Sequence, residues 1–211
     1  MTNPNYTHIT LVVDRSGSMV GIQEEAQGAI NAYLAEQKEV PGDCTLTLIQ
    51  FDKEIDSVFQ GSLADFTSYN LVPRGMTALN DAVGDAINRT GTFLKKMKPK
   101  DRPGKVLVVI VTDGGENSSM DYTLEAVRKM IATQEKDYNW QFVFLSSDLN
   151  APAQARSYGI SNSTTMAAGS SAAYAGTVSV LSHTTTAYRG AGGQSRMGRM
   201  PSKVDADGQT E

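Results

Sequence analysis

The sequence predicts an α/β fold: a doubly wound, mostly parallel six-stranded sheet with one antiparallel edge strand and helices on both faces. Three observations lead to this class. Apolar runs of strand length alternate with longer segments of helical periodicity. The run Val106–Val111 is apolar throughout, as in a central parallel strand covered on both faces. Two strand-like segments separated only by Asp52 and Lys53 indicate an antiparallel hairpin. Such alternation is typical of Rossmann-like folds.

In the first half of the chain, strands show apolar or alternating residues, and helices show apolar residues at a spacing of about 3.6. The helix that begins at Val20 is ended by Pro41 and Gly42, which break regular structure. In order, these elements are a strand at 8–14, a helix at 20–38, strands at 44–51 and 54–60, a short helical turn at 62–68 and a helix at 78–97.

The second half continues the alternation. Its elements are a strand at 105–112, a helix at 122–135, a strand at 140–146, a short helix at 151–158, a weak edge strand at 162–166 and a helix at 170–188. Beyond Gly190 the residues are mainly Gly, Ser, Arg and Gln, which leave little to bury. We therefore expect one domain over residues 1–188 and a disordered Gly/Ser/Arg-containing tail over residues 189–211.

The composition is that of a globular domain with a sizeable core, at 211 residues, 40% hydrophobic and 20% charged. A net charge of −4 argues against nucleic acid or an anionic membrane as a partner. The single cysteine, Cys44, excludes an internal disulfide. With no signal-peptide pattern and no apolar run long enough for a membrane span, we expect a cytoplasmic protein, or a virion protein if the chain is phage-encoded.

Oxygen-bearing side chains stand at three points where a predicted strand ends or a predicted helix begins. Asp14, Ser16 and Ser18 come directly after the first strand, and Asp113 follows the apolar central strand. Thr77 lies in a loop immediately before a helix. Because ligands in doubly wound folds bind beyond the carboxyl ends of the strands, we expect these loops to converge in one crevice. Carboxylate and hydroxyl oxygens suit a hard divalent cation, Mg²⁺ or Mn²⁺. Each fragment alone is also typical of a helix N-cap or a turn, so the interpretation depends on all three together.

The pattern Asp14-x-Ser16-x-Ser18, then Thr77, then Thr-Asp-Gly at 112–114, resembles the metal-ion-dependent adhesion site of von Willebrand factor type A domains, over about residues 6–188. The resemblance implies that Ser16 and Ser18 bind the metal through their hydroxyls and that Thr77 binds it directly in the ligand-competent state. It implies that Asp14 and Asp113 act directly or through water. It also implies a coordination position left open for a carboxylate of another molecule.

Five further side chains are candidates for a rim that contacts a partner. Arg15, Met19, Met76 and Glu116 lie close to the motif in the sequence, and Asp148 follows the strand that ends at Ser146. Each also has a plainer interpretation. The arginine is then an ordinary surface charge, the methionines pack beneath the loops, and the acids are solvated loop residues.

The leading hypothesis is a divalent-cation-dependent protein-binding module without catalytic residues, which captures an Asp or Glu of a partner and works in a larger complex. The resemblance implies partners such as an AAA+ ATPase or an assembly complex. A structural or assembly protein that self-associates, for instance in a phage virion, is the alternative. The acids Asp205, Asp207 and Glu211 on the tail could then enter the metal site of another copy. A metal-dependent phosphatase or hydrolase is least favoured, because a haloacid-dehalogenase-type enzyme needs a second Asp where Ser16 stands.

Overall fold

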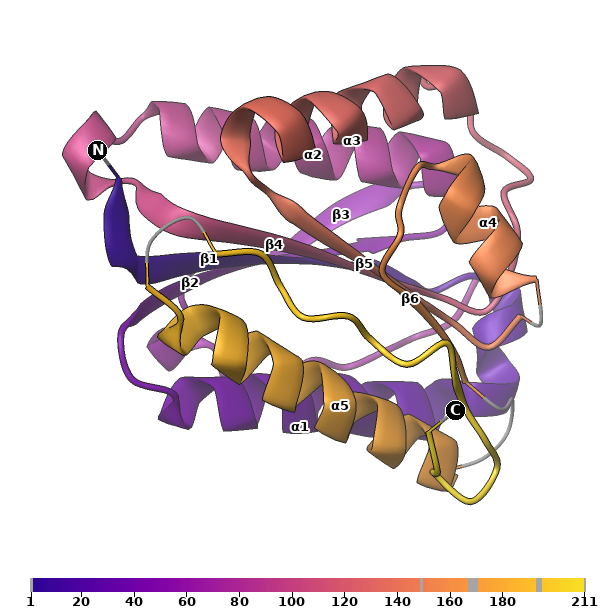
Figure 1. Cartoon of the computed structure of the whole chain (residues 1–211). Coiled ribbons are helices and arrows are strands. Elements are labelled where there is room, and N and C mark those ends of the chain that lie inside the picture. The colour runs from indigo at the N-terminus through magenta and orange to yellow at the C-terminus, as the bar shows by residue number, and fades with distance from the viewer. Residues whose placement is uncertain (1, 149, 167–170, 193–194, 211) are drawn as a thin grey trace.

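The computed structural model describes residues 2–148, 150–166, 171–192 and 195–210. Within these residues, seven strands form one sheet in the order β3-β2-β1-β4-β5-β6-β7 (Figure 1). Edge strand β3 pairs antiparallel with β2, and the other described neighbours pair in parallel. The predicted fold class is confirmed, with one strand more than expected. The strands are β1 Asn3–Asp14, β2 Asp43–Phe51, β3 Ile55–Ser62, β4 Pro103–Thr112, β5 Gln141–Ser146, β6 Ser163–Met166 and β7 Lys203–Val204.

Helices cover both faces of the sheet. In Figure 1, α2 and α3 lie above it, and α1 and α5 lie below it. The short helix α4 packs on the α2 and α3 side through Ala151 and Ala155. The α-helices are α1 Gln23–Glu39, α2 Leu79–Lys95, α3 Leu124–Tyr138, α4 Ala151–Ser157 and α5 Ser171–Gly190, with 3-10 helices η1 Gly17–Ile22, η2 Leu63–Asp65 and η3 Pro99–Asp101.

The alternation of apolar side chains along the central strands creates one core on each face of the sheet. In β1, Leu11 and Val13 join the core beneath α1 and α5, whereas Val12 joins the core beneath α2 and α3. Strand β4 divides in the same way, with Val109 on one face and Ile110 on the other. Because successive side chains of a strand point to opposite faces, an uninterrupted apolar run is what a doubly covered strand requires.

The segment that we expected to be a disordered tail contains the seventh strand. Strand β7 pairs with β6 through Thr165 and Lys203. Met197, Met200 and Val204 are buried, and the Met200 amide donates to Asn162 Oδ1 at 2.7 Å. Residues 195–210 therefore pack on the domain, and do so through single apolar residues that show no periodicity in the sequence.

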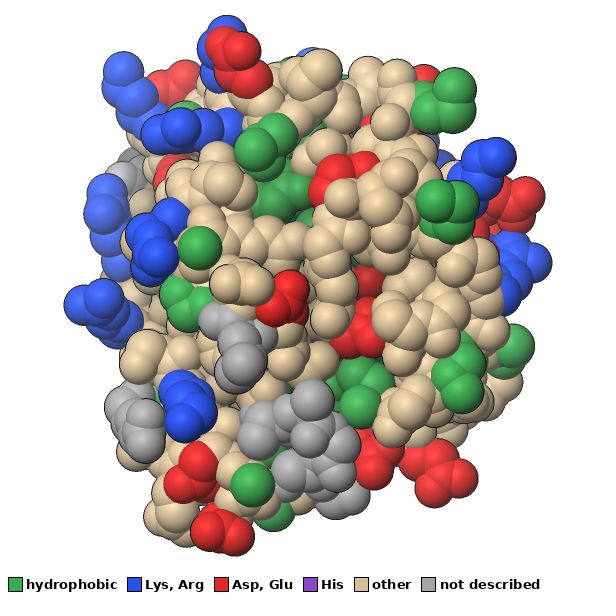
Figure 2. Space-filling view, turned by 90° about the vertical axis from the view of Figure 1, so that its right-hand side faces the viewer, with side chains coloured by type: hydrophobic (Ala, Val, Ile, Leu, Met, Phe, Trp, Pro, Cys, Tyr) green, Lys and Arg blue, Asp and Glu red, His purple; other side chains and the backbone are tan. Residues whose placement is uncertain are grey.

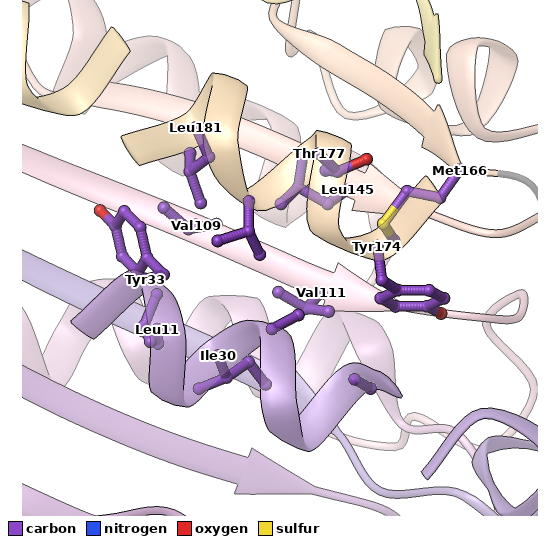
Figure 3. A pocket seen from close by; sticks show the side chains of 13 residues that line it. Leu11, Ile30, Tyr33, Val109, Val111, Leu145, Met166, Tyr174, Thr177 and Leu181 are labelled. Atoms are coloured by element: carbon purple, nitrogen blue, oxygen red, sulfur yellow. The ribbon is translucent and has the colours of Figure 1, made fainter. Parts of the chain in front are cut away.

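A small cavity lies between α1, α5 and the sheet (Figure 3). Its volume is about 30 Å³, and its lining is apolar except for tyrosines and Thr177. The hydroxyl of Thr177 has no hydrogen-bond partner among the described residues. A space of this size accommodates about one water molecule, so we regard it as a packing defect and not as a ligand site.

The carboxyl ends of β1, β4 and β5 meet at the right-hand side of Figure 1. Strand β2 lies on one side of β1 and β4 on the other, so the connections that leave β1 and β4 diverge at this point. In doubly wound sheets such a divergence forms the crevice in which ligands bind. Separately, none of the helices in the described part of the chain is both long and apolar enough to span a bilayer.

Candidate metal centre

Asp14 stands at the carboxyl end of β1 and is completely buried. One carboxylate oxygen, Oδ1, accepts from the backbone amide of Ser16 at 2.7 Å. The other, Oδ2, accepts from the hydroxyl of Thr112 at 2.6 Å. Since Thr112 is the last residue of β4, the carboxylate is held by its own loop and by the neighbouring strand at once.

A chain of hydroxyl and carboxylate groups continues from this point. The hydroxyl oxygens of Ser16 and Ser18 lie 3.0 Å apart, and the Ser18 hydroxyl donates to Asp113 Oδ1 at 2.8 Å. Four of the five predicted ligand residues, from two loops almost a hundred positions apart, are therefore linked by hydrogen bonds. They lie at the crevice that the sheet topology predicts.

The loop that carries Thr77 is fastened to both of these loops. On one side, the Gly17 amide donates to the Gly75 carbonyl at 3.1 Å. On the other, Asn117 brackets Thr77: its Oδ1 accepts from the Thr77 amide at 2.9 Å, and its own amide donates to the Thr77 carbonyl at 3.0 Å. Gly75 has φ +72°, a left-handed conformation that favours glycine. Thr77 is thus placed between the loop after β1 and the loop after β4.

Burial raises the pKa of both carboxyl groups. The pKa of Asp14 rises from 3.8 to about 6, mainly because the group is desolvated, while hydrogen bonds from Thr112 and Ser16 oppose the rise and the charge of Asp113 adds to it. Burial also raises the pKa of Asp113, against the bond from Ser18 and with a contribution from Asp148. None of the ion pairs between described residues includes Asp14 or Asp113. Two adjacent carboxylates without a positive partner are a fitting environment for a dication.

The donor set also indicates the kind of cation. The five side chains supply carboxylate and hydroxyl oxygens only, which suit Mg²⁺ or Mn²⁺. The described residues contain no group of three or more His, Cys, Asp or Glu side chains that could hold a metal ion. A metal at this crevice would therefore depend on the serine and threonine hydroxyls as well as on the two carboxylates.

Two buried or half-buried acids fix the loop after β4 to helix α2. Asp81 accepts from three successive backbone amides, at residues 120–122, at 2.7, 3.0 and 2.7 Å. Glu116 accepts from the Asn80 amide at 2.7 Å and from two amides and a hydroxyl of its own loop. The ring of Tyr122 packs directly on Gly84, where an added Cβ would come within 2.7 Å of it. The loop is therefore held in place without using either predicted metal-binding carboxylate.

The predicted rim residues differ in where their side chains lie. Met76 is 51% exposed, and Asp148 is half-buried with its carboxylate accepting from the Asn150 amide at 2.8 Å. Glu116 turns toward its own loop, as described above. Met19 is completely buried, and Arg15 is 5% exposed. The expectation of a surface role for Met19 and Arg15 therefore needs correction.

Arg15 is buried because two acids face it. Its Nε lies 3.2 Å from Asp52 Oδ2, and its Nη2 lies 2.7 Å from Asp56 Oδ2. Asp52 in turn pairs with Arg74 at 2.7 Å. Burial raises the pKa of Asp52, but the hydrogen bond from the Glu54 amide and the two arginines together bring it below its usual value. This cluster joins the loop after β1 to the β2–β3 turn and to the start of β3.

Sequence reasoning did not assign a role to three residues that position the ligands: Thr112, Asn117 and Asp81. Thr112 was part of the recognised motif, and its place directly after an apolar run could have suggested a bond to the neighbouring strand end. Asn117 and Asp81 carry no such signal. An Asn in a polar loop and an Asp in the first turn of a helix are common for local reasons.

No protein-family profile and no curated protein sequence matches this chain, but solved structures match it in fold. A von Willebrand factor type A protein from Catenulispora acidiphila has a TM-score of 0.61 at 13% identity, over 86% of this chain and 43% of that one. The pilus adhesin SpaC from Lactobacillus rhamnosus GG, in its open conformation, has a TM-score of 0.57 at 13% identity, over 85% and 30%. Proximal thread matrix protein 1 from the mussel byssus has a TM-score of 0.55 at 15% identity, over 86% and 46%. The chain spans less than half the length of each of these proteins.

Proposed function

We propose, for a chain that has the von Willebrand factor type A fold, that it is a cation-dependent protein-binding module. It takes up Mg²⁺ or Mn²⁺ through five side chains and captures a carboxylate of a protein partner. The observation that carries this proposal is the hydrogen-bonded series of oxygen groups at the carboxyl ends of β1 and β4, to which the Thr77 loop is fastened. The proposed ligands are Asp14, Ser16, Ser18, Thr77 and Asp113.

The roles of these side chains follow from their present partners. Asp14 and Asp113 provide negative charge that takes part in no ion pair between described residues. Ser16 and Ser18 bring neutral oxygens between the two carboxylates, which keeps the negative charge of the centre low. When bound, the cation supplies an electrophilic position that a partner's Asp or Glu oxygen completes. Asn117 holds the backbone of Thr77 at its amide and at its carbonyl. The Thr77 hydroxyl binds the cation directly when the partner's oxygen is bound.

The comparisons support a role in protein contacts at the level of the fold, because two of the similar structures are a pilus adhesin and a byssus matrix protein. We assign no catalytic residue. Self-association through a free acidic arm is not part of the proposal, because the described part of that arm packs on the domain and Asp205 accepts from the amides of Asp207 and Gln209.

The test compares cation binding by the full chain and three variants, using calorimetry with Mg²⁺ and with Mn²⁺, followed by thermal unfolding with cation or with chelator. We expect the wild-type protein to bind and to be stabilised, and Asp14→Ala to lose both effects. Thr77→Ala should retain most cation affinity. Asp65→Ala, which removes an exposed acid on η2, is the matched control and should behave as wild type. The proposal would be contradicted if the thermal unfolding midpoint of the wild-type protein were the same with Mg²⁺, with Mn²⁺ and with chelator.

A further inference from the structure

Apolar side chains stand exposed on the loops around the candidate metal centre. Among the described residues, seven large hydrophobic side chains are exposed, and four of them lie on these loops or beside them. The four are Val20 at 64%, Val72 at 57%, Met76 at 51% and Met120 at 85% exposed. Figure 2 looks onto this end of the molecule and shows separate hydrophobic side chains around acidic groups near its centre. Large exposed apolar patches often mark contact sites, whereas single exposed side chains are common. Here four such side chains lie around one candidate centre.

The two methionines project from backbone that is firmly held. Met76 stands between Gly75, whose carbonyl accepts from the loop after β1, and Thr77, which Asn117 brackets. The amide of Met120 donates to Asp81 Oδ2 at 2.7 Å. Their exposure is therefore built into the loops and does not result from a loose segment. Methionine is a flexible, polarizable side chain that adapts to apolar partner surfaces of different shape.

The arginines of the same loops are already neutralised. Arg15 pairs with Asp52 and Asp56, and Arg74 pairs with Asp52 at 2.7 Å and with Glu54 at 2.8 Å. A partner that brought several carboxylates to this surface would find no unpaired guanidinium among the described residues of these loops. Additional acids of a partner would instead face Asp113 and Asp148, which already lie close enough to interact. The surface thus favours apolar neighbours around a single acid.

We propose that the partner presents one carboxylate flanked by large apolar side chains, which cover Met76 and Met120, and not a run of acids. The inference rests on the proposed function, because the carboxylate is the group that the metal centre would take. It adds the chemistry of the flanking residues. It places the contact on the loops before α2 and after β4.

The experiment uses three blocked five-residue peptides with a central Asp, flanked on both sides by leucine, by serine or by further aspartates. Binding to the full chain is followed by NMR titration with Mg²⁺ and again with chelator. We expect the leucine-flanked peptide to bind most tightly and only with Mg²⁺. Met76→Ser and Met120→Ser should each weaken it about tenfold, the factor expected from burying one large apolar side chain. The serine-flanked peptide should be affected little.

Tyr138→Ser removes an exposed apolar side chain from the far end of α3 and serves as the matched control, with binding unchanged. Calorimetry should show that the methionine variants keep wild-type Mg²⁺ affinity. Equal binding of the leucine and serine peptides, or strongest binding of the poly-aspartate peptide, would overturn the inference and leave the proposed function standing. Magnesium-dependent dimerisation that the two methionine changes abolish would assign the surface to a second copy and overturn it too. No magnesium-dependent binding by any peptide would overturn the proposed function, and the inference with it.

Discussion

The buried histidine of β1 makes a quantitative prediction about acid stability. His8 is completely inaccessible to solvent, and its ring nitrogens Nδ1 and Nε2 lie 2.8 and 3.3 Å from the hydroxyls of Thr45 and Thr47. Burial alone lowers the pKa of this imidazole from 6.5 to about 3. The change that tests the consequence is His8→Gln, which keeps polar atoms for the threonines but cannot titrate.

The direction follows from the proton balance. In the unfolded chain His8 binds a proton near pH 6.5, whereas in the folded protein it stays neutral down to about pH 3. Its contribution to stability is therefore fully present above pH 6.5 and is lost as the pH falls toward 3. Each pKa unit corresponds to about 1.4 kcal/mol. Between pH 7 and pH 5 the wild-type protein should lose about 2 kcal/mol of unfolding free energy through this group alone.

The measurement is urea unfolding at pH 7 and pH 5 in chelator, analysed as a two-state transition. Carboxyl groups titrate in the same way in wild-type and variant proteins, so the difference between the two pH responses isolates His8. His183→Gln is the matched control: it removes the other histidine, which is exposed, and should leave the wild-type response unchanged. A His8→Gln protein that loses as much stability as wild type between these pH values would refute the reasoning.

Three further predictions concern packing and the loop after β4. Gly84→Ala should destabilise the fold by about 1–3 kcal/mol in urea unfolding, because the new Cβ would overlap the ring on which α2 packs; Gly91→Ala, with nothing within 4 Å, should instead stabilise it by about 1 kcal/mol. Thr177→Val should stabilise the protein by about 1 kcal/mol, since it removes a buried hydroxyl that has no hydrogen-bond partner among the described residues. Thr185→Val breaks a bond to Tyr33 and should destabilise the protein by a similar amount. Asn117→Ala should, like Thr77→Ala, retain most Mg²⁺ affinity in calorimetry but weaken Mg²⁺-dependent binding of the leucine-flanked peptide several-fold, because its side chain holds the Thr77 amide. The unfolding midpoint in chelator should move little, because Asn117 is exposed.

The convergence of the candidate site could be predicted because it depends on topology more than on side-chain detail. Parallel strands bring their carboxyl ends to the same edge, so oxygen groups after β1 and β4 had to lie close together once the strands were recognised. Element boundaries were harder to predict. Strand β1 begins at Asn3, whereas the predicted strand begins at position 8, because the polar residues at the start of β1 hide the apolar pattern. The bonds between ligand residues agree with the motif, while cation binding itself stays a prediction, as does a cytoplasmic location.

What the sequence could not reveal is the direction in which a side chain turns. Arg15 and Met19 stand beside the motif in the same way as Met76 does, yet the first two are buried and Met76 is exposed. For the arginine, the difference arises from contacts distant in the sequence: Asp52 of the β2–β3 turn and Asp56 of β3 face it. The prediction of a disordered tail was wrong for a related reason. Met197, Met200 and Val204 are buried against the folded domain, and no local sequence pattern indicates those contacts.

The way in which the centre is built explains why its carboxylates remain available. Neutral groups fix every ligand position that the structure defines: the Thr112 hydroxyl and the Ser16 amide hold Asp14, the Ser18 hydroxyl holds Asp113, and an amide side chain holds the Thr77 loop. Other acids stabilise the surrounding loops: Asp52 pairs with arginines, and Asp81 and Glu116 accept hydrogen bonds from backbone amides. Had a lysine or arginine been used to fasten Asp14 or Asp113, the fold would be as well supported but the negative charge would be cancelled. Because it is not cancelled, no cation among the described residues opposes the effect of burial on the two carboxylates, and a divalent ion is the partner that would relieve it.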